Sequence, residues 1–152
     1  MVEQVLHNEQ YHTENTMIDT NVYGTITELK CKTYFLELGY LTSTPDTPSR
    51  YDFILDTGDR LLKIQVKSCH FTDGKIMFKT ESSHITSNGS NRRSYNNEID
   101  YFCTWYENEC YLVPIEECGR GTKSLRLEPT KNGQIKNISF AKDYLAKEVL
   151  SR

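Results

Sequence analysis

Four side chains in the first half of this sequence have the chemistry needed to hydrolyse a phosphodiester bond. They are Glu28, Asp52, Gln65 and Lys67. Hydrolysis with Mg²⁺ requires hard oxygen ligands for the ion, a water placed for in-line attack, and positive charge beside the developing oxyanions. Two acidic groups and a lysine meet these requirements, provided that the fold brings them together.

The stretch RLLKIQVKS, residues 60–68, predicts a strand with Gln65 and Lys67 on one face and three apolar residues on the other. Strand geometry sets Gln65 and Lys67 roughly 6 to 7 Å apart, and a neighbouring strand can place Asp52 about 5 Å to the side. The alternative is that Lys63, Gln65 and Lys67 are the solvated face of an antiparallel strand. The alternation alone favours this alternative.

A helix from about Asn21 to Leu38 is predicted to direct Glu28 towards the protein. Asn21 can cap the first turn, and Gly39 supplies the left-handed residue that commonly follows a helix. Glu28 lies between two apolar arcs, one of Gly24, Cys31, Tyr34, Phe35 and Leu38 and one of Leu29 and Leu36. The alternative is a helix-flank Glu28 paired with Lys32 one turn later.

The remaining pattern predicts a mixed sheet and few helices. Strands are expected at 40–44, 51–56, 61–67 and 73–80, a polar loop at 81–97, a hairpin of 99–106 with 110–115, a turn at 119–124, and a helix at 139–150. We expect residues 1–20 to form a polar, poorly ordered segment and residues 21–152 to form a single domain. The predicted fold class is α/β, or α+β-like.

Composition limits the function classes. With 152 residues, a formal net charge of −3 and no apolar run near 20 residues, the chain predicts no membrane span and no general attraction to nucleic acid. The five cysteines are odd in number, irregularly spaced and without a C-x-x-C, which indicates reduced thiols rather than disulfides or a zinc knuckle. We expect a cytoplasmic, intracellular protein.

The order of these elements resembles the PD-(D/E)XK nuclease superfamily, whose core has a helix with an inward Glu, a strand with Asp and a strand with E/Q-x-K. The blocks SRYDFILD, LLKIQVKS, NEIDYF, CYLVPIEE and LRLEPTKNGQ are similar to a small family of these enzymes that includes a group I intron-encoded homing endonuclease. The resemblance covers roughly Gly24 to Tyr144. It implies a restriction-endonuclease-like core, with a mixed central sheet flanked by helices.

The resemblance also implies roles for the site residues. Asp52 and Gln65 would coordinate Mg²⁺, for which Mn²⁺ would substitute, with help from the backbone carbonyl of Val66 and from Glu28. Lys67 would orient the attacking water and stabilise the charge of the transition state. Gln65 replaces the usual second acid of the family, so it offers an amide oxygen but no charge.

The letters PD occur literally at Pro45 and Asp46. Asp46, however, stands between prolines in TPDTP, a composition typical of a tight turn. Asp52 opens an apolar strand and matches the family block, so we assign the conserved role of the superfamily's aspartate to Asp52 rather than to Asp46.

Contacts with DNA are expected from two places. Arg50 directly precedes the Tyr51-Asp52 pair and is placed to touch a phosphate beside the metal. The polar segment at 81–97 offers phosphate and base-edge donors at Asn88, Asn91, Arg92, Arg93 and Tyr95. An ordinary solvated loop is the alternative for this segment.

The prediction is a Mg²⁺-dependent DNA endonuclease, and the resemblance implies site-specific cleavage of double-stranded DNA, of the homing type, by a homodimer or homotetramer. A chain of this size covers a limited stretch of duplex, so recognition of a long site would require oligomerisation. The aromatic residues of 101–113 are a candidate interface or, alternatively, core. Two other functions stay open: a restriction, repair or junction-resolving nuclease, and a non-catalytic DNA-binding relative with the same fold.

Overall fold

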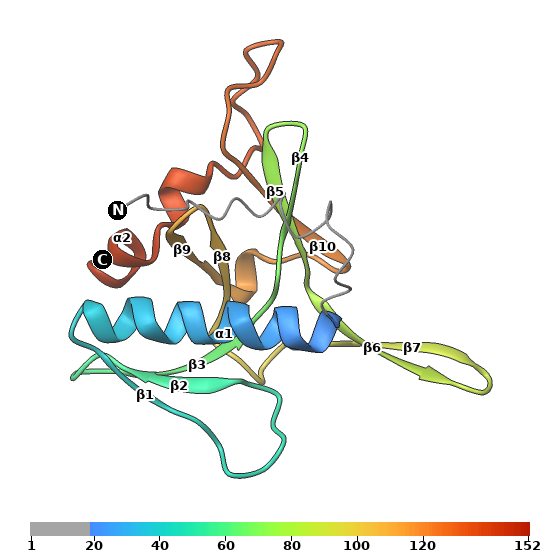
Figure 1. Ribbon diagram of the computed structural model, residues 1–152. Helices are drawn as coiled ribbons and strands as arrows, with labels where there is room; N and C mark the ends of the chain where they lie inside the picture. Colours follow the sequence, from blue (N-terminus) through green and yellow to red (C-terminus); the bar gives the residue numbers. More distant parts are fainter. Residues whose placement is uncertain (1–18) are drawn as a thin grey trace, which may run out of the picture.

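The computed structural model describes residues 19–152, and a mixed five-stranded sheet forms its centre (Figure 1). The elements are α1 (Thr20–Glu37), β1 (Leu41–Ser43), β2 (Phe53–Asp56), β3 (Leu61–Val66), β4 (His70–Thr72), β5 (Lys75–Lys79), β6 (Glu81–Thr86), β7 (Gly89–Ser94), β8 (Tyr101–Tyr106), β9 (Glu109–Pro114), η2 (Ile115–Glu117), β10 (Thr122–Arg126), η3 (Ala141–Tyr144) and α2 (Ala146–Leu150). The expected disorder of the N-terminal segment concerns residues 1–18, which lie outside the described residues.

The strand order in the central sheet is β1-β2-β3-β8-β9. Strands β3 and β8 run parallel, with Ile64 opposite Tyr101, and the other neighbours are antiparallel. A parallel pair needs a long connection, and the chain between β3 and β8 supplies β4 to β7. The prediction of a mixed sheet with few helices is confirmed.

Helix α1 covers one face of this sheet (Figure 1). Its buried residues are Thr27, Cys31 and Phe35, which pack over the apolar side of β2, β3, β8 and β9. The N-cap is Asp19 rather than the expected Asn21, because the Asp19 carboxylate accepts the Asn21 N–H at 3.0 Å. Gly39, at φ 85°, follows the helix as predicted.

The opposite face of the sheet carries a second core. A three-stranded sheet in the order β10-β5-β4 packs there, with Ile76, Phe78 and Leu125 buried against Phe102 and Val113. Residues of β8 and β9 therefore serve both cores. Most of the aromatic stretch from 101 to 113, offered as a candidate interface or as core, belongs to the core: Phe102, Tyr106 and Tyr111 are buried, and Tyr101 and Trp105 are partly buried against it.

The polar segment at 81–97 is not a loop. It contains β6 and β7, which pair antiparallel with Ser82 opposite Arg93 and form a hairpin that projects from the body (Figure 1). Backbone hydrogen bonds hold this hairpin, and they require no apolar side chains. For this reason hydrophobic periodicity did not reveal the two strands.

Two other expectations were wrong. The predicted helix at 139–150 is broken at Leu145, which has extended φ and ψ values of −54° and 128° and bridges to Tyr111 of β9. The predicted turn at 119–124 contains Gly121 at φ 94° but leads at Thr122 into β10, which pairs with β5. In both cases a contact with a distant strand decides the local structure.

Substitutions in α1 test which face is buried. Phe35 is fully buried and Leu36 is 52% exposed, so Phe35→Ala should lower the free energy of unfolding by about 3 to 5 kcal/mol, and Leu36→Ala by about 0.5 kcal/mol. Urea unfolding of the two variants measures the difference. Equal losses would contradict the placement of α1.

Candidate active site

The carboxylate of Asp52 is anchored at the end of β3. Its Oδ2 accepts hydrogen bonds from the Val66 backbone N–H at 2.6 Å and from Gln65 Nε2 at 2.8 Å. The Asp52 N–H in turn donates to the Ile64 carbonyl at 2.8 Å, which continues the pairing of β2 with β3 by one residue. The sheet register thus sets Asp52 beside the two residues that follow Ile64.

Two oxygens of this cluster converge on one point. Gln65 Nε2 donates to Asp52 Oδ2 and also to the Val66 carbonyl oxygen, at 3.1 Å. A single NH₂ group therefore reaches two of the oxygens that we nominated as metal ligands, those of Asp52 and Val66. Rotation of the amide by about 180° would present Oε1 to the same point. A carboxylate, a carbonyl and an amide oxygen suit a hard divalent cation, so the residues present fit Mg²⁺.

The protonation of Asp52 is perturbed by its surroundings. Burial, foremost, and the nearby charge of Glu28 raise the pKa of the carboxyl, whereas the Val66 N–H and the ammonium groups of Lys67 and Lys32 lower it. The net effect is a rise of the pKa from 3.8 to about 6. When burial disfavours the charged form of an acid in this way, a bound cation stabilises that charged form. Perturbed carboxyl groups of this kind are typical of functional sites.

Lys67 lies directly after β3 and is held by Tyr95. Its Nζ donates to the Tyr95 hydroxyl at 2.9 Å and lies 4.7 Å from the centre of the Tyr95 ring. The Lys67 backbone N–H donates to the Cys103 carbonyl at 2.9 Å, which continues the pairing with β8. Lys67 and Gln65 are partly buried and hydrogen-bonded, whereas Lys63 on the same strand face is exposed. The polar face is therefore not simply solvated.

Helix α1 brings Glu28 and Lys32 to the same region. Thr27, the residue before Glu28, shares a hydrogen bond of 3.1 Å with Ser68, the residue after Lys67. Glu28 forms an ion pair with Lys32, as the helix-flank alternative predicted, and its charge nevertheless acts on Asp52. Lys32, which also donates to Thr44 at 2.8 Å, is a site residue that the sequence reasoning treated only as a partner of Glu28.

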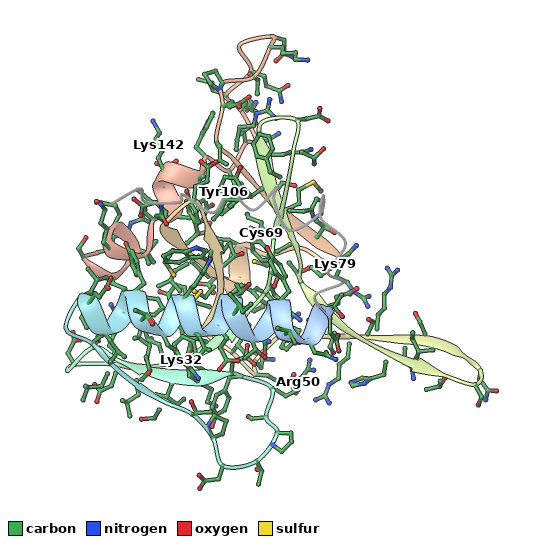
Figure 2. The ribbon with its side chains drawn as sticks, in the orientation of Figure 1. Lys32, Arg50, Cys69, Lys79, Tyr106 and Lys142 are labelled. Atoms are coloured by element: carbon green, nitrogen blue, oxygen red, sulfur yellow. The ribbon has the colours of Figure 1, made fainter. Side chains whose placement is uncertain are left out.

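Arg50 joins the site to the hairpin. Its guanidinium donates to Glu98 at 2.6 Å, to the Ser82 hydroxyl at 2.9 Å and to the Ser94 carbonyl at 2.8 Å. It also stacks at 3.9 Å on the ring of Tyr95, and Figure 2 shows it near the base of the β6–β7 hairpin. Arg50 thus links the segment before β2 to the hairpin. Its guanidinium is engaged within the protein, whereas a free guanidinium was expected to contact a phosphate.

The other expected DNA contacts divide into two groups. Asn88, Asn91, Arg92 and Arg93 are exposed on the hairpin, and Arg93 also pairs with Glu98. Tyr95 is only 4% exposed. Its buried ring contacts Arg50, Lys67 and Phe102, so it supports the site from inside instead of offering its face to solvent.

The choice between the two aspartates also has a structural counterpart. Asp46 is exposed in the turn between β1 and β2, whereas Asp52 lies against Gln65 and Val66. The structure therefore brings Asp52, Gln65, Val66 and Lys67 together, as the sequence reasoning expected.

Comparisons with known proteins found one family model and a solved structure that are similar to this chain. A protein-family model described as PD-(D/E)XK endonuclease matches residues 18–147. Among solved structures, the fold is similar to that of the bacterial homing endonuclease I-Ssp6803I, with a TM-score of 0.72 and 21% identity, over 88% of this chain and 93% of that one. No curated protein sequence matches. No helix of residues 19–152 is long and apolar enough to cross a membrane.

The raised pKa of Asp52 predicts a pH-dependent stability difference in metal-free protein. Below about pH 4 the carboxyl is protonated in both the folded and unfolded states, and above its folded pKa of about 6 the native state bears the cost of the buried charge. Asp52→Asn should therefore gain stability relative to the unsubstituted protein as the pH rises from 4 to 7, reaching about 2 to 3 kcal/mol. Urea unfolding in a chelator measures the gain, and a pH-independent difference would contradict it.

Proposed function

Because the chain belongs to the PD-(D/E)XK endonuclease family, we propose that it hydrolyses phosphodiester bonds of double-stranded DNA in a Mg²⁺-dependent reaction, with Mn²⁺ as a substitute. The observation that supports this most is the convergence of Asp52 Oδ2 and the Val66 carbonyl on one point beside Gln65, next to Lys67. Hard oxygen ligands and an ammonium group on neighbouring residues are the minimum for this chemistry.

Each residue has a distinct role in the proposed reaction. Asp52, Gln65 Oε1 and the Val66 carbonyl would hold the ion, with Glu28 binding directly or through water, and the ion would supply Lewis-acid stabilisation of the phosphate charge. Lys67 orients the attacking water and stabilises the charge that develops on the phosphate oxygens. The Tyr95 hydroxyl fixes the position of the Lys67 ammonium group.

The exposed hairpin is the proposed DNA-binding element. Arg92 and Arg93 contribute positive charge, and Asn88 and Asn91 contribute hydrogen-bonding amides, on a two-stranded ribbon of the kind that enters a groove of DNA. Arg50 and Tyr95 connect the base of this ribbon to Lys67. Binding of DNA by the hairpin would therefore place the sugar-phosphate backbone of the DNA beside Lys67 and the proposed metal site.

The finer assignment is a site-specific enzyme of the homing type that acts as a homodimer or homotetramer in the cytoplasm. The fold shared with I-Ssp6803I supports the homing-type assignment, and five free thiols suit a reducing compartment such as the cytoplasm.

Cleavage of a random DNA library, with sequencing of the ends, should yield one long site. A preference for branched DNA or short repeated sites would instead favour a resolving or restriction enzyme. Sedimentation of the protein with and without DNA gives the oligomeric state.

A non-catalytic DNA-binding relative is the second candidate, and Gln65 is the observation that favours it. The amide brings no charge, and its NH₂ group donates to both oxygens of the metal site. A protein of this kind would bind DNA tightly and would bind no divalent ion.

The role of Lys67 can be separated from that of a surface lysine. Lys67→Ala should lower kcat by about 10² to 10⁴-fold with DNA affinity nearly unchanged, because the ammonium group acts on the transition state. Lys63→Ala is the matched control, since Lys63 is exposed on the same strand face, and it should cleave normally. Single-turnover cleavage measures both variants, and full activity of Lys67→Ala would refute the assignment.

Substitution of Gln65 tests whether the amide is a ligand. Gln65→Leu should abolish measurable Mn²⁺ binding in the presence of DNA, and Gln65→Glu should tighten it by about tenfold, because a carboxylate adds charge to the ligand set. Calorimetric titration above pH 8, where the Asp52 carboxylate and the carboxylate introduced by Gln65→Glu are both ionised, gives the affinities for Mn²⁺. If Gln65→Leu binds Mn²⁺ as the unsubstituted protein does, Gln65 is not a ligand.

The hairpin can be tested through the salt dependence of binding. Arg92→Ala should weaken DNA binding and reduce the slope of log K against log salt concentration by about 1, as expected for loss of one phosphate contact. Lys147→Ala, an exposed change on α2, should leave the slope unchanged. Equal slopes for both variants would show that Arg92 makes no phosphate contact in the complex with DNA.

A further inference from the structure

Three cysteines from three different elements meet in the core beneath α1. Cys31 comes from α1, Cys103 from β8 and Cys110 from β9, and their Sγ atoms all lie within 4.8 Å of one another. All three side chains are fully buried. Sequence spacing did not indicate this group, because Cys31 is far from the other two cysteines and the three follow no metal-ligand spacing.

The sheet register disfavours a disulfide within the group. Cys103 lies opposite Leu112, and Cys110 lies opposite Trp105, so the two cysteines are diagonal neighbours. Diagonal Cα atoms are separated by about 7 to 8 Å, which is wider than the usual span of a disulfide. Their Sγ atoms are 3.2 Å apart, a contact distance, and all five cysteines are free thiols.

The spacing instead suits a central ion bound by three sulfurs. Three sulfurs bonded to one ion at about 2.3 Å lie about 3.5 to 4 Å from one another, so shifts of the order of 1 Å in the side chains would complete the site. Among the residues that the structure describes, no histidine or carboxylate joins the group. The site is therefore three-coordinate, whereas structural Zn²⁺ sites have four ligands.

The apolar surroundings select the charge of the ion. The group is enclosed by Phe35, Leu112 and Ala146 among other core residues, and a net charge buried there would be costly. Three thiolates around a monovalent ion such as Cu(I) carry two negative charges, whereas three thiolates around a trivalent ion are neutral. We infer that Cys31, Cys103 and Cys110 form a binding site for a trivalent thiophilic metalloid, for which arsenite is the probe.

The binding reaction is a substitution without oxidation or reduction. As(OH)₃ exchanges its three hydroxyl groups for three cysteine sulfurs: each S–As bond forms as an As–O bond breaks, and each thiol proton leaves with a hydroxyl group as water.

An occupied three-cysteine site would cross-link α1 to the central sheet. Cys31 follows Glu28 by three residues on α1, so an ion on Cys31, Cys103 and Cys110 would join the helix that carries Glu28 to both β8 and β9. Because the sulfurs are fully buried, the ion can enter only when α1 separates from the sheet or during folding. Loading should therefore be slow for the folded chain and faster during refolding.

Mass spectrometry of the full-length reduced protein tests the site directly. After refolding with arsenite, the chain should gain one arsenic atom and lose three hydrogens, and its unfolding temperature should rise, because the ion binds the folded state. A chain that forms no adduct, or an adduct that leaves the unfolding temperature unchanged or lowers it, would overturn the proposal. The test does not depend on nuclease activity.

Cysteine variants assign the adduct. Cys31→Ala and Cys110→Ser should lose the three-sulfur adduct and the rise in unfolding temperature, whereas Cys118→Ala and Cys69→Ser should keep both, since neither residue belongs to the group. Circular dichroism confirms that each variant is folded, and Cys110→Ala replaces Cys110→Ser if the latter is not. An adduct that survives Cys31→Ala, or that requires Cys118, would overturn the assignment.

Discussion

The hydrogen bonds that hold the Asp52 carboxylate at the end of β3 are the interaction on which the candidate active site depends. The Val66 N–H and the Gln65 amide fix Oδ2 in position, and the same two residues supply the other oxygens of the proposed metal site. Partial burial makes the charge costly and raises the pKa to about 6. A divalent cation would offset that cost, so the local arrangement that destabilises the ion-free protein favours metal binding.

A small number of polar contacts connects the candidate active site with the β6–β7 hairpin, the proposed DNA-binding element. The Tyr95 hydroxyl accepts a hydrogen bond from the Lys67 ammonium group, and the Tyr95 ring stacks against the Arg50 guanidinium. Arg50 and Arg93 both pair with Glu98, whose pKa is lowered by this pairing, foremost by the hydrogen bond from Arg50. The hairpin is thus attached to the same group of residues that positions Lys67. A shift of the hairpin on DNA would be transmitted to the lysine through Tyr95.

The sequence predicted the elements that depend on local patterns. The alternation in RLLKIQVKS, the apolar stripe of α1 and Gly39 after the helix identified β3 and α1. The cluster around Asp52 was expected only because the succession of blocks resembles the PD-(D/E)XK family. Two kinds of element were missed. Strands β6 and β7 form a local hairpin that is held by backbone hydrogen bonds and leaves no apolar pattern, and Leu145 leaves the helical conformation to bridge to the distant Tyr111. The pairings of Arg50 and the burial of Tyr95 were also beyond prediction, because both depend on where the base of the hairpin lies against the body.

The central claim is that Asp52, Gln65 and Val66 hold one divalent ion beside Lys67. Crystals of the complex with DNA, grown with Mn²⁺ and measured at the manganese absorption edge, test it most directly. The account predicts an anomalous peak at bonding distance from Asp52, the Val66 carbonyl and a rotated Gln65 Oε1. A complex with DNA that shows no peak at this position, with Gln65 Nε2 still bonded to Asp52, would contradict it.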